Sequence, residues 1–474
     1  MMSPYTSPLA FLLLLLSSVT PQSHDNAATV ALEALSLARN RASTATAAFA
    51  DDASVPLQAW ADCLQLYDYA AGRVRRLITG AGYGSNDART LLSAASTAHR
   101  TCITGLREAG GLTAHAEREG VEVARRLEDA LAAVPTSENL YNSTAKREVF
   151  RSWQGSVNKA DVVVAQDGSG DFKTINAAVA LLNRRKEGGR RVVIHVKAGV
   201  YRENVLIGGW LRNLVFVGDG IDKTIVTSNR SFHDGHTTIR SATFGVWADG
   251  FWAKDMTFEN TAGAARQQAV ALLAASDQAI FHRCSFKGYQ DTLFTHSLRQ
   301  FYRDCEIHGT VDFIFGNAAA VIQNCDLFIR TPLPRQANTV IAQGRDSPLQ
   351  NTGISIHASR VRPSPEFEKV KDRFESYLGR PWRRYSRTVV MKTELDGMIS
   401  SEGWKAWEGG FAPDTLYYAE YLNTGKGAAT ARRVNWRGFH LIADRREATT
   451  YSVENFIQGR AWIPESGVPF WPGV

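Results

Sequence analysis

The chain has 474 residues, of which 44% are hydrophobic, so it is long enough for two domains and can bury at least one large core. This composition excludes a disordered protein. The formal net charge of +7 favours anionic partners. No run of five or six basic residues occurs, and we interpret the densest basic stretch, 184–191, as a solvated loop. We therefore expect no nucleic-acid partner.

The N-terminus carries an apolar run at 9–16, followed by small and polar residues. This run has the length of a signal-peptide core and is too short to span a bilayer, so we assign residues 1–23 to a signal peptide. No later stretch approaches 18 apolar residues, which predicts no membrane-spanning helix. Secretion would permit disulfides and would make Asn142 and Asn229, which begin two sequons, candidate glycosylation sites.

Residues 24–134 are rich in alanine, leucine, arginine and glutamate, and their apolar residues recur at helical spacing. Glycines at 80–84 and 110–111 separate the helical segments. We predict a small antiparallel helical bundle. Cys63 and Cys102 lie on two different predicted helices, where they could form a disulfide or remain two buried thiols.

Residues 135–159 are polar and aperiodic, which predicts an exposed linker, and the dibasic pair Lys146-Arg147 makes it a candidate processing site. From 160 to 474 the chain changes to short β-branched and aromatic runs, separated by glycine, asparagine and aspartate. Helical periodicity is scarce in this part, which argues against a doubly wound α/β sheet.

An internal repeat organises the second half of the chain. Cys284, Cys305 and Cys325 are 21 and 20 residues apart, and each follows a predicted strand. The same 21-residue spacing separates Gly288 from Gly309 and Asp291 from Asp312. A period of about 20 residues with strands in each repeat is typical of a solenoid of stacked coils. Because the leucine pattern of leucine-rich repeats is absent, we predict a right-handed parallel β-helix.

This geometry has consequences for the residues that repeat. Equivalent positions on neighbouring coils lie about 4.8 Å apart, so either Cys284–Cys305 or Cys305–Cys325 could form a disulfide. Asp291 and Asp312 would also be neighbours. Two carboxyl groups that close resist ionising together, so one should keep its proton while the other is charged, as in a reaction centre. The alternative is that both aspartates are turn residues of the solenoid.

The flanking residues favour the reaction centre. The stretches Gly288-Tyr289-Gln290-Asp291-Thr292-Leu293 and Gly309-Thr310-Val311-Asp312-Phe313-Ile314-Phe315-Gly316 resemble the two most characteristic motifs of the pectin methylesterase family. Three further motifs occur in the expected order, Gly199-Val200-Tyr201-Arg202-Glu203, Gln268-Ala269-Val270-Ala271-Leu272 and Leu378-Gly379-Arg380-Pro381-Trp382. The helical half resembles the inhibitor-like pro-region that precedes many plant-type members.

The resemblance implies a role for each matching residue. Asp312 would be the nucleophile and Asp291 the general acid and later the general base, with Gln268 and Gln290 donating hydrogen bonds to the oxyanion. Arg380 would hold Asp312 ionised, and Thr238 and Trp382, together with Gln268 and Arg380, would contact the sugar. The resemblance also implies a Cys305–Cys325 disulfide and leaves Cys284 free.

The reaction implied is the hydrolysis of galacturonate methyl esters in pectin, with release of methanol, and it needs neither a metal nor another cofactor. The implied protein is a secreted monomer of the cell wall, with pectin as substrate and a proteinaceous pectin methylesterase inhibitor as a candidate partner.

Other functions are less consistent with the sequence. It contains no Gly-x-Ser-x-Gly nucleophile elbow and no His-Glu-x-x-His zinc motif. Polygalacturonases and pectin lyases share the β-helix, but their chemistry needs other residues. A carbohydrate-binding module without turnover is the alternative from another class, and the presence of Asp291, Asp312, Gln290 and Arg380 argues against it.

Overall fold

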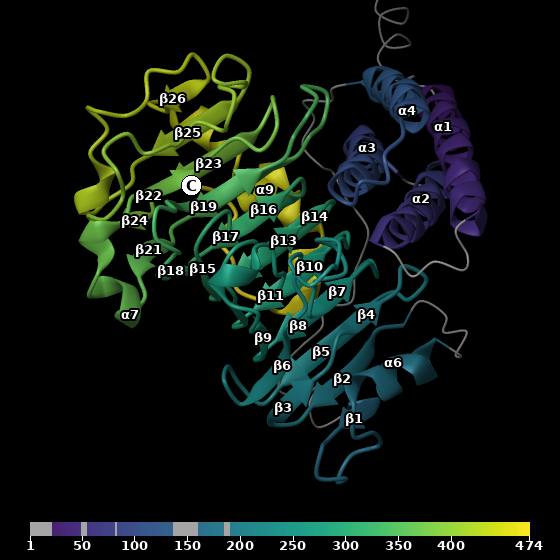
Figure 1. The fold of residues 1–474 in the computed structure, drawn as a ribbon, viewed down its shortest axis with the longest axis horizontal. Coiled ribbons are helices and arrows are strands. Elements are labelled where there is room, and N and C mark those ends of the chain that lie inside the picture. The colour runs from purple at the N-terminus through teal and green to yellow at the C-terminus, as the bar shows by residue number, and fades with distance from the viewer. Residues whose placement is uncertain (1–20, 49–54, 81–82, 136–159, 184–189) are drawn as a thin grey trace, which may run out of the picture.

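The structure is a computed structural model that describes residues 21–48, 55–80, 83–135, 160–183 and 190–474. Four long helices form a bundle, and the rest of the chain forms a solenoid of parallel strands (Figure 1). The helices are α1 (Pro21–Ala48), α2 (Val55–Thr79), α3 (Ser85–Glu108) and α4 (Ala114–Ala132). The predicted helical bundle is therefore confirmed.

The ends and contacts of these helices follow from the local sequence. The glycine-containing segments end α2 at Thr79 and α3 at Glu108, and the Thr113 hydroxyl caps α4 by accepting a hydrogen bond from the Ala116 amide at 3.1 Å. The disulfide Cys63–Cys102 joins α2 to α3, as one of the two alternatives predicted.

The solenoid has three parallel sheets, in which each strand pairs with the equivalent strand of the next coil. The 11-stranded sheet contains β1 (Val162–Val164), β2 (Val192–Val196), β5 (Leu214–Gly218), β8 (Trp252–Lys254), β11 (Ala279–His282), β14 (Arg299–Arg303), β17 (Ala319–Gln323), β20 (Gly353–His357), β23 (Arg387–Met391), β25 (Tyr417–Tyr421) and β26 (Phe439–Leu441). The 8-stranded sheet contains β3 (Gly199–Arg202), β6 (Thr224–Ser228), β9 (Thr257–Asn260), β12 (Ser285–Lys287), β15 (Glu306–Gly309), β18 (Asp326–Ile329), β21 (Arg360–Pro363) and β24 (Glu394–Leu395). The 7-stranded sheet contains β4 (Val205–Ile207), β7 (Phe244–Val246), β10 (Leu272–Ala274), β13 (Leu293–Thr295), β16 (Ile314–Gly316), β19 (Asn338–Gln343) and β22 (Ser376–Gly379). The architecture is the predicted right-handed parallel β-helix.

One tight turn recurs along the solenoid. After successive strands of the 11-stranded sheet the chain places a single residue in the left-handed backbone region, for example Asp255, Arg283, Asp304 and Asn324, with φ between 51° and 57°. This turn bends the chain into the 8-stranded sheet within one or two residues. It keeps the repeat near 20 residues wherever no loop is inserted.

Phenylalanine rings fill the interior of the solenoid from coil to coil. Phe281 stacks on Tyr302 at 4.9 Å, and Phe258 stacks on Phe286 at 5.7 Å, all fully buried. Such contacts add to the burial of large apolar side chains. At the N-terminal end of the solenoid, α6 (Ile175–Leu182) covers the core with its apolar face.

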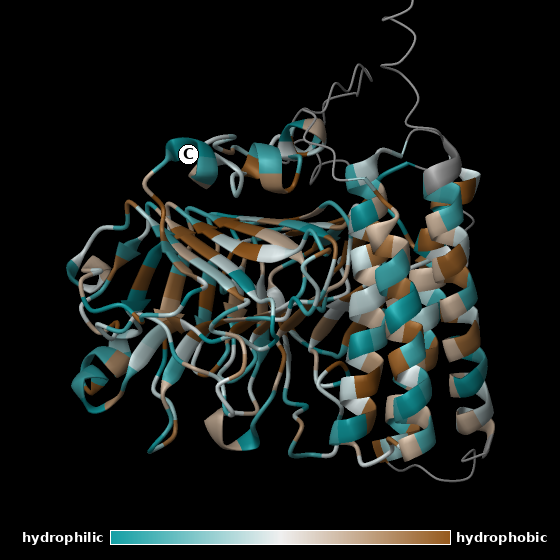
Figure 2. Ribbon diagram, turned by 90° about the horizontal axis from the view of Figure 1, so that it is seen from above, coloured by the Kyte–Doolittle hydropathy of each residue, from teal (hydrophilic) through white to brown (hydrophobic). Residues whose placement is uncertain are grey.

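Two outer faces of the solenoid are also covered. The short C-terminal helices α8 (Arg445–Thr449) and α9 (Val453–Phe456) and the residues that follow pack on the 11-stranded sheet. The four-helix domain packs on the 7-stranded sheet, and Figure 2 shows the helices standing along one side of the stacked strands. Another short helix, α7 (Pro365–Glu368), lies beside β21.

The predicted Cys305–Cys325 disulfide is wrong, because Cys284, Cys305 and Cys325 are all buried free thiols. The Cys305 thiol donates to the Arg303 carbonyl at 3.3 Å, and the Cys325 thiol donates to the Gln323 carbonyl at 3.4 Å. Burial raises the pKa of both thiols well above its usual range. Both are therefore neutral hydrogen-bond donors inside the core and poor sources of the thiolate that disulfide formation requires.

Several predictions concern residues outside the described ranges. Most of the signal peptide, Asn142 and the pair Lys146-Arg147 belong to this group. Asn229, the other candidate glycosylation site, is exposed. Within the described ranges, the helices are too short or too polar to cross a bilayer.

We expect three free thiols per chain when the unreduced protein is denatured and titrated with a thiol reagent, because five cysteines are present and two form Cys63–Cys102. Without denaturant, burial should protect all three. A single thiol after denaturation would instead support a second disulfide, and a Cys284→Ser variant without any free thiol would identify that disulfide as Cys305–Cys325.

Candidate active site

All seven residues predicted to act in catalysis or substrate binding line one pocket. The pocket has a volume of about 190 Å³ and lies between the 7-stranded sheet and helices α2 and α3. From the solenoid it is lined by Thr237, Thr238, Ile239, Gln268, Gln290, Asp291, Phe294, Asp312, Phe315, Ala342, Arg380, Trp382 and Trp407. The remaining lining residues belong to the helical domain.

Strand register explains why Asp291 and Asp312 meet. Leu293 in β13 pairs with Ile314 in β16, so the residues two positions earlier occupy the same turn on consecutive coils. Both aspartates have left-handed backbones, with φ of 62° and 51°. Their backbones therefore have the turn conformation that the alternative interpretation predicted. Their side chains, however, are buried at the pocket, with only 7% and 5% exposure, and turn formation does not require that.

The two glycines that share this spacing close the same turn. A Cβ atom on Gly288 would lie 2.7 Å from Thr292 Oγ1, and one on Gly309 would lie 2.2 Å from Phe313 Cβ. Each glycine therefore lets the turn pack against the side chain four residues later. The 21-residue spacing that the glycines share with the aspartates therefore reflects the same turn geometry on two consecutive coils.

Asp312 is held by two neighbours. Arg380 donates two hydrogen bonds to its carboxylate, from Nε to Oδ1 at 2.9 Å and from Nη2 to Oδ2 at 2.7 Å. The Thr339 hydroxyl donates to Oδ1 at 2.6 Å and accepts from the Asp312 amide at 2.8 Å. Burial lowers the pKa of Arg380, but its contacts with Asp312 outweigh this and raise it overall. A bidentate pair of this kind orients the carboxylate and favours charge-assisted hydrogen bonds.

Asp291 has a different environment. Burial raises the pKa of Asp291 well above its usual range, and the neighbouring charges of Asp312 and Glu108 raise it further, while Arg380 opposes them. The two carboxyl groups therefore have different electrostatic surroundings. Asp291 holds a proton at a pH at which an exposed aspartate is ionised.

Neutral donors and aromatic rings surround the pair. Gln268 precedes β10 and Gln290 directly precedes Asp291, and neither glutamine is exposed. Gln268 Oε1 is buried without a hydrogen-bond partner among the described residues, so its amide can still reorient toward a ligand. Trp382 packs edge-on against Phe315 at 6.0 Å, which forms an apolar wall beside the polar groups.

The sequence analysis missed Thr339 and Trp407. The Trp407 ring lies 4.2 Å from the Arg380 guanidinium. Thr339 occupies the coil after Asp312, but a loop inserted after β18 places it 27 residues away instead of 20 or 21. An alignment of coils that allowed insertions would have found Thr339. No repeat marks Trp407.

The helical domain closes the pocket. Asp62 of α2 is buried and accepts hydrogen bonds from Thr237 Oγ1 and Arg240 Nε, both at 2.6 Å. From α3, Thr104 accepts a hydrogen bond from Arg383 Nη2 at 2.8 Å. Glu108, near the end of α3, lines the pocket and acts on the pKa of Asp291. The polar groups of the site therefore face helices α2 and α3.

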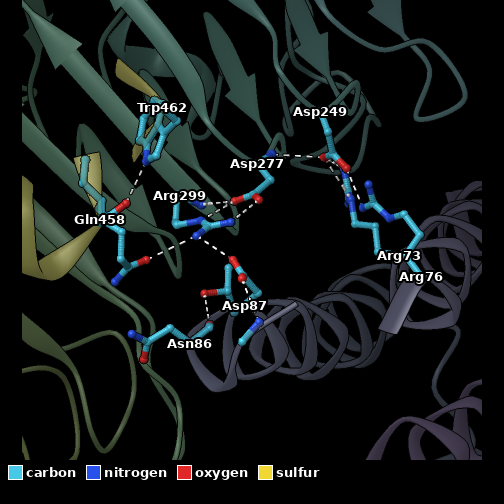
Figure 3. A network of polar contacts seen from close by, with 12 residues as sticks. Arg73, Arg76, Asn86, Asp87, Asp249, Asp277, Arg299, Gln458 and Trp462 are labelled. Atoms are coloured by element: carbon cyan, nitrogen blue, oxygen red, sulfur yellow. Dashed lines mark hydrogen bonds and ion pairs between the residues drawn. The ribbon is translucent and has the colours of Figure 1, made fainter. Parts of the chain in front are cut away.

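Two buried ionic networks attach the helical domain beside the pocket (Figure 3). In the first, Asp249 of the solenoid accepts hydrogen bonds from Arg73 Nη2 at 3.0 Å and Arg76 Nη2 at 2.6 Å. Arg73 Nη2 also donates to the carbonyls of Trp247 and Ala275, at 2.5 and 2.6 Å. These carbonyls follow β7 and β10, so Arg73 satisfies backbone groups that the sheet leaves unpaired.

In the second network the solenoid supplies the cation and the helical domain supplies an anion. Arg299 of the solenoid pairs with Asp87 in the first turn of α3 at 2.9 Å, and with Asp277 at 2.7 Å. The Asp277 amide donates to Asp249 at 3.0 Å, which links the two networks. Each domain therefore contributes a buried cation and a buried anion to the interface.

Comparison with known proteins identifies the family. A model of the pectinesterase family matches residues 161–460, and a model of the plant invertase/pectin methylesterase inhibitor family matches residues 15–133. The chain belongs to the pectinesterase family. It is a carboxylic ester hydrolase that acts on the methyl esters of pectin.

Individual relatives agree with this assignment. Probable pectinesterase/pectinesterase inhibitor 36 of Arabidopsis thaliana is 48% identical, with 87% of this chain and 86% of that protein covered. Pectinesterase 2 of Citrus sinensis is 45% identical, with 88% and 82% covered. The crystal structure of pectin methylesterase from carrot is 50% identical with a TM-score of 0.65, and covers 66% of this chain and 98% of its own.

Acid should weaken the first network. Arg73 and Arg76 overcome the effect of burial and lower the pKa of Asp249 to about 2. A carboxyl group with a depressed pKa stabilises the fold above its unfolded-state pKa and loses this contribution as the pH falls through the folded one. We therefore expect about 2 kcal/mol of stabilisation at pH 5 to disappear toward pH 2.

Unfolding of wild type and Asp249→Asn, measured between pH 5 and pH 2, tests this expectation. The difference in unfolding free energy should shrink as the pH falls. The exposed Asp129→Asn serves as a matched control, with a small difference throughout. A difference between wild type and Asp249→Asn that stays constant down to pH 2 would contradict the assigned role of the ion pair.

Proposed function

We propose that this chain hydrolyses galacturonate methyl esters in homogalacturonan with Asp312 as nucleophile and Asp291 as general acid and base. The observation that carries the proposal is the contrast between two adjacent buried carboxyl groups. Asp312 is paired with Arg380, whereas burial and like charge keep the proton on Asp291. A charged nucleophile beside a proton donor is what ester cleavage requires.

In the first half of the reaction, a carboxylate oxygen of Asp312 attacks the C6 carbonyl of the methylated galacturonate. The carbonyl oxygen becomes an oxyanion, to which the amide groups of Gln268 and Gln290 donate hydrogen bonds. Asp291 gives its proton to the methoxy oxygen as the C–O bond breaks. Methanol leaves, and the sugar remains attached to Asp312 as an acyl-enzyme.

In the second half, Asp291 is ionised and acts as a base. It removes a proton from a water molecule that attacks the same carbonyl carbon. Collapse of this intermediate releases Asp312 as a carboxylate and the sugar as a free carboxylic acid, which then loses its proton to solvent. Asp291 is again protonated, so each turnover consumes one water and restores both groups.

Binding of the sugar would use the walls of the pocket. We assign Trp382 to an apolar contact with a sugar ring and Thr238 to a polar one, with Gln268 and Arg380 contacting the group at C6. The positions of all four on one pocket support this assignment.

We also propose a signal peptide at 1–23, an inhibitor-like helical domain at 24–134, a linker at 135–159 and the esterase domain at 160–474. The protein is then secreted to the cell wall as a monomer, with glycosylation at Asn142 and Asn229. The exposure of Asn229 supports the second glycosylation site.

Replacing either aspartate by asparagine should abolish methanol release without unfolding the chain. Asparagine also tolerates the left-handed backbone of both turns, so the fold should survive. We expect Asp312→Asn to lower kcat by at least about 10⁴-fold and Asp291→Asn by about 10² to 10⁴-fold. Methanol release from methylated pectin and thermal unfolding would be measured together. A variant that unfolds would favour the turn-residue interpretation, and one that binds pectin with wild-type turnover would refute the assigned roles.

The helical domain supports a second proposal, that it inhibits the esterase site of its own chain. The pocket, with a volume of about 190 Å³, is smaller than the roughly 300–1,000 Å³ of most ligand sites. Residues of α2 and α3 lie where a polymer would have to pass. Because the domain is held by buried ion pairs, we propose that cutting the linker alone leaves it in place.

Opening the interface should therefore activate the enzyme. In Arg73→Ala/Asp87→Ala, Asp249 and Arg299 each lose a partner, and breaking a buried pair costs about 3–5 kcal/mol. We expect methanol release to rise at least about tenfold over wild type, which corresponds to only about 1.4 kcal/mol of shift toward the open form. Arg75→Ala, an exposed change on the same helix, is the matched control. Equal rates for all three proteins would contradict intramolecular inhibition.

A further inference from the structure

A second cleft opens on a different side of α2. It has a volume of about 510 Å³ and lies between α2 and residues 209–212, which connect β4 to β5. Its lining shares no residue with that of the esterase pocket. We call it the seam cleft, because it follows the contact between the helical domain and the solenoid. Its features are those of a binding site.

An exposed tryptophan is held rigidly at the seam cleft. Trp210 is 63% exposed, yet its Nε1 donates a hydrogen bond to Asn183 Oδ1 at 2.7 Å. The ring lies on Gly208, where a Cβ atom would approach it to 2.3 Å. A solvent-exposed aromatic ring that is already held in place by such contacts loses little conformational entropy when a ligand packs on it. Its exposed surface is therefore preorganised for contact.

Tyr69 of α2 extends the aromatic surface across the domain boundary. Its ring centre lies 6.0 Å from that of Trp210, and its edge contacts Gly209, where a Cβ atom would come within 2.7 Å. The hydroxyl accepts a hydrogen bond from Gln65 at 3.0 Å. The two consecutive glycines thus allow two rings from different domains to lie against the same loop.

The charge of the seam cleft is positive. Arg212 is exposed and makes no ion pair with any described residue, and Arg73 and Arg76 share the single carboxylate of Asp249 deeper in the cleft. The other lining acid, Asp68, is already paired with Arg39. An arginine beside an aromatic ring suits a sugar that carries a carboxylate, because the guanidinium can bind the carboxylate while the sugar ring packs on the aromatic face.

We infer that the seam cleft binds de-esterified galacturonate units of pectin, with a sugar ring on Trp210 and its carboxylate on Arg212. The inference rests on the proposed function, because that reaction converts neutral methyl esters into the carboxylates that Arg212 would recognise. The cleft is open while the helical domain closes the esterase site. The closed protein therefore binds the demethylated polymer.

Calorimetric titration of the full chain with a galacturonate hexamer tests the inference. We expect Trp210→Ala and Arg212→Gln each to weaken binding at least about tenfold, because each removes one of the two recognition elements. The fully methyl-esterified hexamer should bind at least about tenfold more weakly than the acid, and added salt should weaken binding of the acid. Trp471→Ala and Arg75→Gln, which alter an exposed tryptophan and an exposed arginine outside the cleft, should leave the affinity within twofold.

Three results would overturn the inference. The first is no binding of the hexamer, and the second is equal binding by wild type and both cleft variants. The third is binding that is lost in Trp382→Ala but kept in Trp210→Ala, because this result would place the hexamer in the esterase pocket. Methanol release is measured separately on the same proteins and on Arg73→Ala/Asp87→Ala, in which the esterase pocket is expected to open. Binding that depends on Trp210, with no methanol release even from Arg73→Ala/Asp87→Ala, would refute the proposed function alone, whereas turnover without such binding would refute the seam cleft alone.

Discussion

The parallel register between coils is the constraint on which the esterase site depends. Hydrogen bonding between strands fixes which residues are neighbours, so Leu293 lies beside Ile314 and the two turns before them coincide. Asp291 and Asp312 are brought together by this stacking, although 21 residues separate them. A slip of one residue would turn one carboxyl group away from the pocket, because side chains alternate between the two faces of a strand.

Stacking creates two equivalent carboxyl groups, and their neighbours make them different. Arg380 and Thr339 come from the two coils that follow, and both donate hydrogen bonds to Asp312. Asp291 is buried, and the charges of Asp312 and Glu108 both raise its pKa. The same residue type in the same turn therefore has two different environments, set by what the next coils place beside it.

The interface between the domains is governed by the cost of burying charge. On the face of the solenoid Arg299 is buried and Asp249 is largely buried, and each is compensated by a residue of the helical domain. Arg73 adds hydrogen bonds to two backbone carbonyls. When the helical domain moves away and opens the esterase pocket, these charged groups must be hydrated at the same time. Access to the site is therefore coupled to the free energy of separating the ion pairs.

The sequence by itself determined the architecture and most of the esterase site. The 20- to 21-residue spacing reports a local property, the length of one coil, and so it predicted the solenoid and the pairing of Asp291 with Asp312. The motif around Arg380 identified that residue through its family, because inserted loops place it 68 residues after Asp312 and outside any repeat.

Tertiary structure decided the rest. The same spacing that paired the aspartates also suggested a disulfide, but packing made Cys305 and Cys325 neutral donors to backbone carbonyls. Nothing local in the sequence relates Arg73 to Asp249, 176 residues away, or places α2 over the pocket. Such contacts form only when the two folded domains dock. They depend on the match of buried charges between the domains, and no sequence pattern within either domain encodes that match.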